Sequence, residues 1–285
     1  MRVEERVDAA VEAAAPQTAA SPTGAGATGG PSAPDFRLLG PVQAWTGGRP
    51  LPLGDRKQRL VLAILLLEVN QLLPVERLVD LVWPDVPPPS ARRTLQAHVS
   101  RLRATLARAC PQDATLVRHG AGYRLSCDPR LIDAHEFRRL FDLAQRTGDP
   151  RERAALLDRA LALWQGPALA DVTTEELRMR LCHGLHSLRL AALEERAEAY
   201  LRLGRHLSLL DELTGLAARH PYRQRITAAL MVTLHRSGST AEALDAYQRT
   251  RQRLNDELGI SPPPELQRLH LAILRGDPCE AGTDA

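Results

Sequence analysis

Hydrophobic and polar positions follow two different periods along this chain of 285 residues. From residue 36 to residue 53, short apolar runs separated by Gly and Pro predict a small amino-terminal sheet with a turn at Thr46-Gly47-Gly48. After this sheet, apolar residues recur every three to four positions, which is the period of an amphipathic helix. We expect Asp55 to cap a first helix that runs through Glu68, and Pro74 to begin a second helix that runs through Val82.

The segment from Ser90 to Leu125 is the most informative part of the pattern, and Ser90 is a residue type that caps helices well. One side of the predicted helix is apolar and consists of Leu95, Val99, Leu102 and Leu106. The opposite side is polar and consists of Arg92, Arg93, Gln96, Ser100 and Arg103. Two short strands follow, at 116–118 and 123–125, joined by His119-Gly120-Ala121-Gly122. A helix followed by such a hairpin is typical of a winged helix, in which the apolar side packs and the polar side can contact DNA.

From Asp133 onward the period is helical almost throughout. The expected helices cover residues 133–147, 150–164, 174–203, 205–219, 222–236, 239–258 and 263–274. The run from Gly238 to Thr250 resembles the small-residue and tyrosine pattern of a tetratricopeptide helix pair, and such pairs stack into a concave scaffold. A plain helical bundle that supports the first domain is the alternative.

The expected fold class is therefore an α+β winged helix-turn-helix domain followed by an all-α tetratricopeptide-like helical domain. Ala, Gly, Pro, Ser and Thr dominate the first 34 residues, so we expect a disordered N-terminal extension there. The predicted boundaries are 1–34 for the extension, 35–128 for the winged helix, 130–278 for the helical domain and 279–285 for a tail.

Positive charge is concentrated in the winged-helix segment. Residues 90–124 contain seven arginines and one acidic residue, Asp113, whereas the formal net charge of the whole chain is only +3. Such a basic patch attracts duplex DNA through its phosphates. On charge alone, an arginine-rich helix face is more often a solvated surface, and the hairpin behind the helix is what favours DNA binding. The first turns of the helix after Asp55 also carry Arg56, Lys57 and Arg59, an arrangement that a bound phosphate would make tolerable.

Other classes of protein are disfavoured by the sequence. The longest apolar run, 60–67, is too short to cross a bilayer, and acidic residues near the start argue against a signal peptide, so we expect a cytoplasmic protein without membrane contact. The four cysteines lack the spacing of a metal site or a disulfide framework, and we expect neither a metal nor a cofactor. His135-Glu136 lacks the second histidine of a zinc protease, and neither a phosphate-binding loop nor a Gly-x-Ser-x-Gly turn occurs. We expect no catalytic residues and no enzymatic activity.

Several sequence segments, taken together, are specific enough to suggest a protein family. The first half contains Phe36-Arg-Leu-Leu-Gly-Pro-Val, Pro52-Leu-Gly-Asp-Arg-Lys-Gln-Arg-Leu-Val-Leu-Ala-Ile-Leu-Leu-Leu, Leu78-Val-Asp-Leu-Val-Trp, Leu95-Gln-Ala-His-Val-Ser-Arg-Leu-Arg and Gly122-Tyr-Arg-Leu. The second half contains Ala162-Leu-Trp-Gln-Gly-Pro-Ala-Leu-Ala-Asp-Val, His220-Pro-Tyr-Arg and Asp256-Glu-Leu-Gly-Ile-Ser-Pro-Pro-Pro-Glu-Leu-Gln-Arg-Leu-His. Over residues 36–278 the chain thus resembles the Streptomyces antibiotic regulatory protein family, transcription activators of secondary-metabolite gene clusters.

The resemblance implies an OmpR-type DNA-binding domain followed by a bacterial transcriptional activation domain. It also implies binding to direct repeats near a promoter, with head-to-tail self-association, and recruitment of RNA polymerase holoenzyme through its sigma factor. No receiver domain precedes the DNA-binding half in this sequence, and we expect a small, stand-alone member of the family that works at the nucleoid. Whether the protein activates or represses transcription follows from the resemblance alone, because a repressor would need only a different operator position.

The resemblance also suggests residue roles. The recognition helix would read DNA with Arg93, Gln96, Ser100, Arg101 and Arg103. Further DNA contacts would come from Arg92, Thr94, His98, Arg56 and Arg59, with Thr94 and His98 touching phosphates. At the wing, Arg118 would enter the minor groove, His119 stands where an arginine is common, and Tyr123 would pack beneath. The stiff, proline-rich loop 83–89 suits contact with a partner, and we assign polymerase contact to Trp83, Asp85 and Val86.

Two alternatives compete with a DNA-binding activator. The helical half could bind a protein or peptide as a scaffold, with DNA binding secondary. It could also bind a small metabolite that tunes DNA binding, although the sequence defines no pocket for one.

Overall fold

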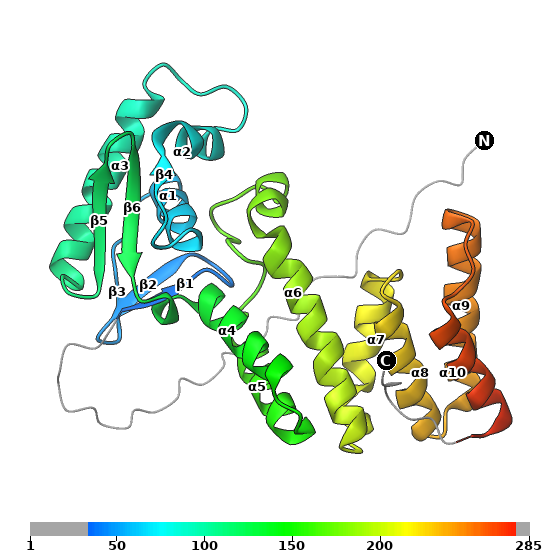
Figure 1. Cartoon of the computed structure of the whole chain (residues 1–285). Coiled ribbons are helices and arrows are strands. Elements are labelled where there is room, and N and C mark those ends of the chain that lie inside the picture. Colours follow the sequence, from blue (N-terminus) through cyan, green and yellow to red (C-terminus); the bar gives the residue numbers. More distant parts are fainter. Residues whose placement is uncertain (1–33, 278–285) are drawn as a thin grey trace, which may run out of the picture. The chain divides into compact units, whose positions relative to one another are not determined.

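The computed structural model describes residues 34–277 (Figure 1). Apart from Pro34, the predicted extension lies outside the described residues, and so does the predicted tail at 279–285. The first sheet contains β1 (Asp35–Arg37), β2 (Gln43–Thr46) and β3 (Arg49–Pro50), antiparallel in that order. Gly47 and Gly48 form the predicted turn between β2 and β3 with φ angles of 55° and 74°, a conformation that glycine adopts without strain.

Three helices follow: α1 (Arg56–Leu67), α2 (Val75–Val82) and α3 (Ala91–Ala109). The predicted cap of α1 is confirmed, because the Asp55 side chain accepts a hydrogen bond from the backbone N–H of Gln58 at 2.9 Å. Every residue from Leu60 to Leu66 is buried, so α1 is the central helix of this half. Pro74 does not begin the second helix as predicted, since it lies one residue before α2 in an extended conformation.

Pro74 instead belongs to a strand that sequence analysis missed. β4 (Leu73–Pro74) pairs with β6 (Gly122–Cys127), which pairs in turn with β5 (Ala114–His119). β5 and β6 form the predicted wing, and Figure 1 shows this hairpin beside α3. A Cβ at Gly122 would lie 2.5 Å from the carbonyl oxygen of Leu73, so only glycine allows β4 to approach β6 this closely.

The second half is helical at nearly all the predicted positions. A short 3-10 helix, η1 (Pro129–Leu131), precedes α4 (Asp133–Arg146), α5 (Pro150–Ala162) and the long α6 (Glu175–Arg202). The remaining elements are η2 (His206–Leu209), α7 (Leu210–Arg219), α8 (Gln224–Arg236), α9 (Thr240–Leu258) and α10 (Pro264–Arg275). No helix within residues 34–277 is long and apolar enough to cross a membrane.

The hydrophobic core divides inside α6. One continuous cluster of buried side chains extends from Phe36 to Ala192, and a second extends from Ala197 to Ile273. The first cluster therefore joins the winged helix to α4, α5 and the first part of α6. The predicted boundary between residues 128 and 130 crosses this shared core, and it stays a prediction.

Backbone contacts also join the two halves. The buried carboxylate of Asp133, at the start of α4, accepts hydrogen bonds from the backbone N–H groups of Leu38 and Leu39 at 2.8 to 2.9 Å. Leu38 and Leu39 in turn accept hydrogen bonds through their carbonyl groups from Leu169 and Gln165 at 3.0 and 2.8 Å. The loop after β1 is thus held by α4 and by the segment that follows α5.

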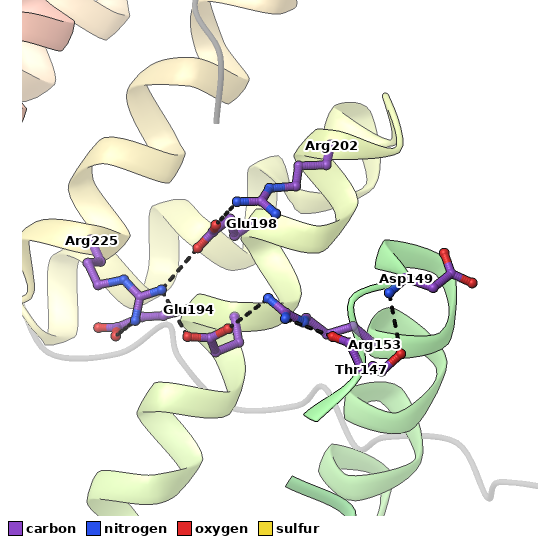
Figure 2. A network of polar contacts seen from close by, with 8 residues as sticks. Thr147, Asp149, Arg153, Glu194, Glu198, Arg202 and Arg225 are labelled. Carbon is purple, nitrogen blue, oxygen red and sulfur yellow. Dashed lines mark hydrogen bonds and ion pairs between the residues drawn. The ribbon is translucent and has the colours of Figure 1, made fainter. Parts of the chain in front are cut away.

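A layer of charged residues lies where the two clusters meet (Figure 2). Glu194 of α6 is 6% exposed and lies 3.6 Å from Arg223 and 3.5 Å from Arg225. Arg225 also contacts Glu195 and Glu198, both at 3.0 Å. Burial raises the pKa of Glu194, and the two arginines counteract this effect. The layer links α6 to α8 through ion pairs.

Candidate DNA-binding surface

The helix α3 has the two sides that its sequence predicts. The four leucine and valine side chains of its apolar side are at most 1% exposed, and they are Leu95, Val99, Leu102 and Leu106. The polar side chains Arg92, Arg93, Gln96 and Ser100 are exposed. Ser90 occupies the N-cap position, but its side chain makes no capping hydrogen bond there. Within the described part of the chain, Arg93 and Gln96 make no polar side-chain contact, so their donors face solvent.

Arg92 differs from Arg93 in having a partner. Its guanidinium lies 3.2 Å from the carboxylate of Glu76 on α2, and both side chains are more than half exposed. An exposed ion pair of this kind contributes about 0 to 1 kcal/mol. A phosphate can therefore replace Glu76 as the partner of Arg92 at small cost.

Arg103 connects α3 to the wing. Its Nε donates a hydrogen bond of 2.8 Å to the carbonyl oxygen of Leu116 on β5. The side chain is exposed, yet its direction is fixed by this bond. Arg103 therefore links α3 to β5 through a side-chain hydrogen bond.

His98 lies in the interior, where a phosphate cannot reach it. Its side chain is 5% exposed, and its Nδ1 lies 3.9 Å from the carboxylate of Asp55. Burial lowers the pKa of His98, Asp55 raises it, and Arg101 and Lys57 lower it further. The ring is therefore neutral near pH 7 and packs between α3 and the start of α1. Thr94 is half-buried, and Arg101 is exposed.

The cations at the start of α1 have partners within the protein. Arg56 Nε donates to the carbonyl oxygen of Val172 at 3.2 Å. Arg59 donates to the carbonyl oxygen of Gly54 at 3.0 Å and forms an ion pair with Asp171 at 3.1 Å. These contacts hold α1 against the segment before α6. Arg56 and Arg59 thus each have a partner within the protein.

The remaining residues predicted to contact DNA or RNA polymerase lie in the wing and in the loop after α2. Arg118 and His119 are exposed at the tip of the wing, where Arg118 Nε lies 3.4 Å from the carbonyl oxygen of Gly120. Tyr123 is buried beneath the hairpin, as expected. In the loop, Asp85 and Val86 are exposed, and Val86 is 84% exposed.

Trp83 does not present its ring to a partner, because it is 8% exposed and belongs to the first core cluster. The positive side chain of Lys57 lies over this ring, a contact that the sequence pattern did not reveal. No group of three or more potential metal ligands occurs within residues 34–277.

Two protein families match the chain, one in each half. The family described as "Transcriptional regulatory protein, C terminal" matches residues 48–125, which contain α1, α2, α3 and most of the wing. The family described as "Bacterial transcriptional activator domain" matches residues 132–274, from the start of α4 to α10.

Several curated regulatory proteins align with most of this chain. The chain is 39% identical to the regulatory protein DnrI of Streptomyces peucetius, over 85% of this chain and 93% of DnrI. It is 36% identical to the transcriptional regulator RedD of Streptomyces coelicolor, over 86% of this chain and 71% of RedD. Its similarity to the regulatory protein AfsR of Streptomyces griseus, at 38% identity, spans only 24% of AfsR.

A solved structure supports the fold. Mycobacterium tuberculosis EmbR, in complex with a low-affinity phosphopeptide, matches with a TM-score of 0.79 and 34% identity. The match covers 87% of this chain and 66% of the EmbR chain. From its OmpR-type winged helix, its activator domain and its similarity to DnrI along nearly the full length of that protein, the chain belongs to the Streptomyces antibiotic regulatory protein family of DNA-binding transcriptional regulators.

Proposed function

We propose that this protein binds direct repeats near the promoters of one secondary-metabolite gene cluster and recruits RNA polymerase holoenzyme through its sigma factor. It does this at the nucleoid, in the cytoplasm, without catalytic chemistry of its own. The observation that carries the proposal is the exposed polar side of α3 beside a wing, where Arg93 and Gln96 have no side-chain partner among residues 34–277. Both matching families belong to transcription regulators, so a scaffold with secondary DNA binding is not favoured.

The recognition helix supplies the base contacts in this proposal. Arg93 donates two hydrogen bonds to a guanine, and Gln96 pairs with an adenine through its amide. Ser100 lies on the same exposed side and accepts or donates one hydrogen bond. These three residues determine which operator sequence is bound.

The remaining exposed residues position the protein on the DNA backbone. Arg92, Arg101 and Thr94 contact phosphates around the major groove, and Arg118 and His119 enter the adjacent minor groove. Arg103 supports the wing and reaches the backbone from there. We leave His98 and Arg59 out of the DNA-binding set, since His98 is buried and Arg59 is half-buried in an ion pair with Asp171. Arg56 is exposed and remains a phosphate contact in this proposal.

The polymerase contact in this proposal comes from the loop after α2. Asp85 and Val86 project into solvent between α2 and α3, where a sigma factor can reach them while α3 lies in the major groove. Trp83 supports this loop from the interior. Two protomers bound to adjacent repeats in the same orientation contact each other head to tail.

A footprinting experiment tests the proposal. The purified protein is incubated with promoter fragments from its own gene neighbourhood at two salt concentrations, together with R93A and R275A. Protection of tandem repeats that weakens with salt supports the proposal, and R93A should lose about 1 to 3 kcal/mol of binding free energy. R275A removes an equal charge from α10 and should protect the same repeats as the wild type. Absence of protection at every promoter would reject operator binding.

A further inference from the structure

The chain contains 37 basic residues of the Lys and Arg type, and all except Lys57 are arginine. Lys57 lies in the first turn of α1, where the partial positive charge of the helix disfavours a cation. Its neighbours Arg56 and Arg59 extend to carbonyl and carboxylate groups of the segment before α6. Lys57 instead places its Nζ 4.7 Å from the centre of the Trp83 ring. A cation over an indole ring is an attractive arrangement, which offsets the unfavourable helix position.

Trp83 marks the point where α2 ends and the loop begins. Its backbone N–H closes the last turn of α2 by donating to the carbonyl oxygen of Val79 at 2.9 Å, while its ring is buried. All residues from Pro84 to Ser90 are exposed. The loop is next held at Pro88, whose carbonyl oxygen accepts from the N–H of Ala91 at 2.8 Å. Within the described part of the chain, Asp85 and Val86 make no hydrogen bond or ion pair between these two points.

The direction of the loop therefore depends on its two ends and on the stiffness of its prolines. Each proline fixes its own φ angle and restricts the residue before it, so the loop has few backbone conformations and its course depends on where Trp83 places its first residue. The Lys57 ammonium lies over the Trp83 ring, which is only 8% exposed. Lys57 thus connects α1 to Trp83, the residue at which the loop begins.

We propose that Lys57 is a positioning residue for the loop 84–89, because its ammonium holds Trp83 in the orientation that presents Asp85 and Val86 to RNA polymerase. The inference rests on the polymerase contact proposed above for this loop. It concerns activation and not DNA affinity, since Lys57 extends toward the loop after α2. The strength of such contacts at partly exposed sites corresponds to about a 2- to 5-fold change in the population of the ordered loop.

The test uses the full-length protein with K57A, K57R, D85A and V86A. Each variant is assayed for operator affinity by fluorescence anisotropy, and for transcript yield with purified RNA polymerase holoenzyme at saturating regulator. K57A should retain operator affinity within about 2-fold and lose about 2- to 5-fold in transcript yield. K57R should restore the yield, because a guanidinium also stacks over an indole ring. A purely structural defect in α1 would lower operator affinity too.

Several outcomes would overturn the inference, and they are distinguishable. A loss of operator affinity in K57A with normal transcript yield at saturating regulator would make Lys57 a DNA contact, whereas a loss of both would make it a structural residue of α1. Normal transcript yield in K57A together with a reduced yield in D85A or V86A would keep the polymerase contact and reject the positioning role. Normal yield in both loop variants would reject the polymerase contact of the loop, and the role of Lys57 with it.

Discussion

The carboxylate of Asp133 accepts a 2.8 Å hydrogen bond from the backbone N–H of Leu38, a residue 95 positions earlier in the chain. The same carboxylate receives the N–H of Leu39 at 2.9 Å, so one buried side chain satisfies two donors of the loop after β1. The helical half therefore completes the hydrogen bonding of the DNA-binding half.

The protonation of Asp133 should be visible at Leu38 and Leu39. Burial raises the pKa of Asp133 to about 6, against the lowering effect of its backbone hydrogen bonds. Because this folded-state pKa exceeds the ordinary value of 3.8, the contribution of Asp133 to stability is fully present below about pH 4. Between about pH 4 and pH 6 this contribution is lost, and the free energy of unfolding falls by about 1.4 kcal/mol per pH unit. The amide resonances of Leu38 and Leu39 should titrate with a midpoint near pH 6, and a midpoint below about 4.5 would contradict this.

A fragment limited to the predicted winged helix should be unstable. Residues 34–128 lack α4, α5 and α6, whose side chains complete the first core cluster, and they also lack Asp133. We expect the fragment to show no cooperative unfolding transition by circular dichroism, whereas residues 34–202, which extend through α6, should unfold cooperatively. Equal stability and operator affinity of the short fragment and the full chain would show that the shared core is dispensable.

The wing depends on glycine at position 122. In G122A the new methyl group would lie 2.5 Å from the carbonyl oxygen of Leu73, so β4 and β6 must separate. We expect a loss of about 1 to 3 kcal/mol in the free energy of unfolding, measured with urea. G184A is the matched control, because Gly184 lies in α6 with open space around it. That variant should be neutral or more stable by up to about 1 kcal/mol, and a similar loss in both variants would contradict the steric explanation.

Arg93 and Arg103 should differ in how they affect specificity. R93A removes a proposed base contact, so its affinity should fall mainly for the native operator, with relaxed preference at one base pair. R103A loses the bond to Leu116 and displaces the wing, so its affinity should fall by a similar factor for every DNA sequence. Affinity measurements on a set of single-base operator variants separate the two patterns. A change of base preference in R103A would make Arg103 a base-reading residue.

The sequence predicted best those structural features that depend on residues close together in the chain. The helices from α4 to α10 follow the 3.6-residue period, and their bounds agree with the predicted ones within two residues, except that α7 begins at Leu210, after the 3-10 helix η2, instead of at 205. The cap at Asp55 and the turn at Gly47-Gly48 are equally local and were also predicted. Local chemistry of this kind is encoded within a few positions of the chain.

Features that depend on distant residues were missed. β4 has only two residues, too few for a pattern, and it exists because Gly122 allows it to pair with β6. The family resemblance suggested a phosphate contact for His98, and only the packing of α3 against the start of α1 shows that it is buried. The roles of Arg56 and Arg59 depend on Val172 and Asp171, more than 100 positions away. No helical or strand period carries that information.

The ion-paired layer around Glu194 determines how α6 and α8 are aligned. Two apolar helix faces can slide by a turn and still bury similar surface. A slide of one turn here would leave Glu194 in the interior without a cation, and an unpaired buried charge costs about 3 to 5 kcal/mol. The layer therefore determines the register of the two helices more than the strength of their association. This single register fixes where α7 to α10 lie along α6, the longest helix within residues 34–277.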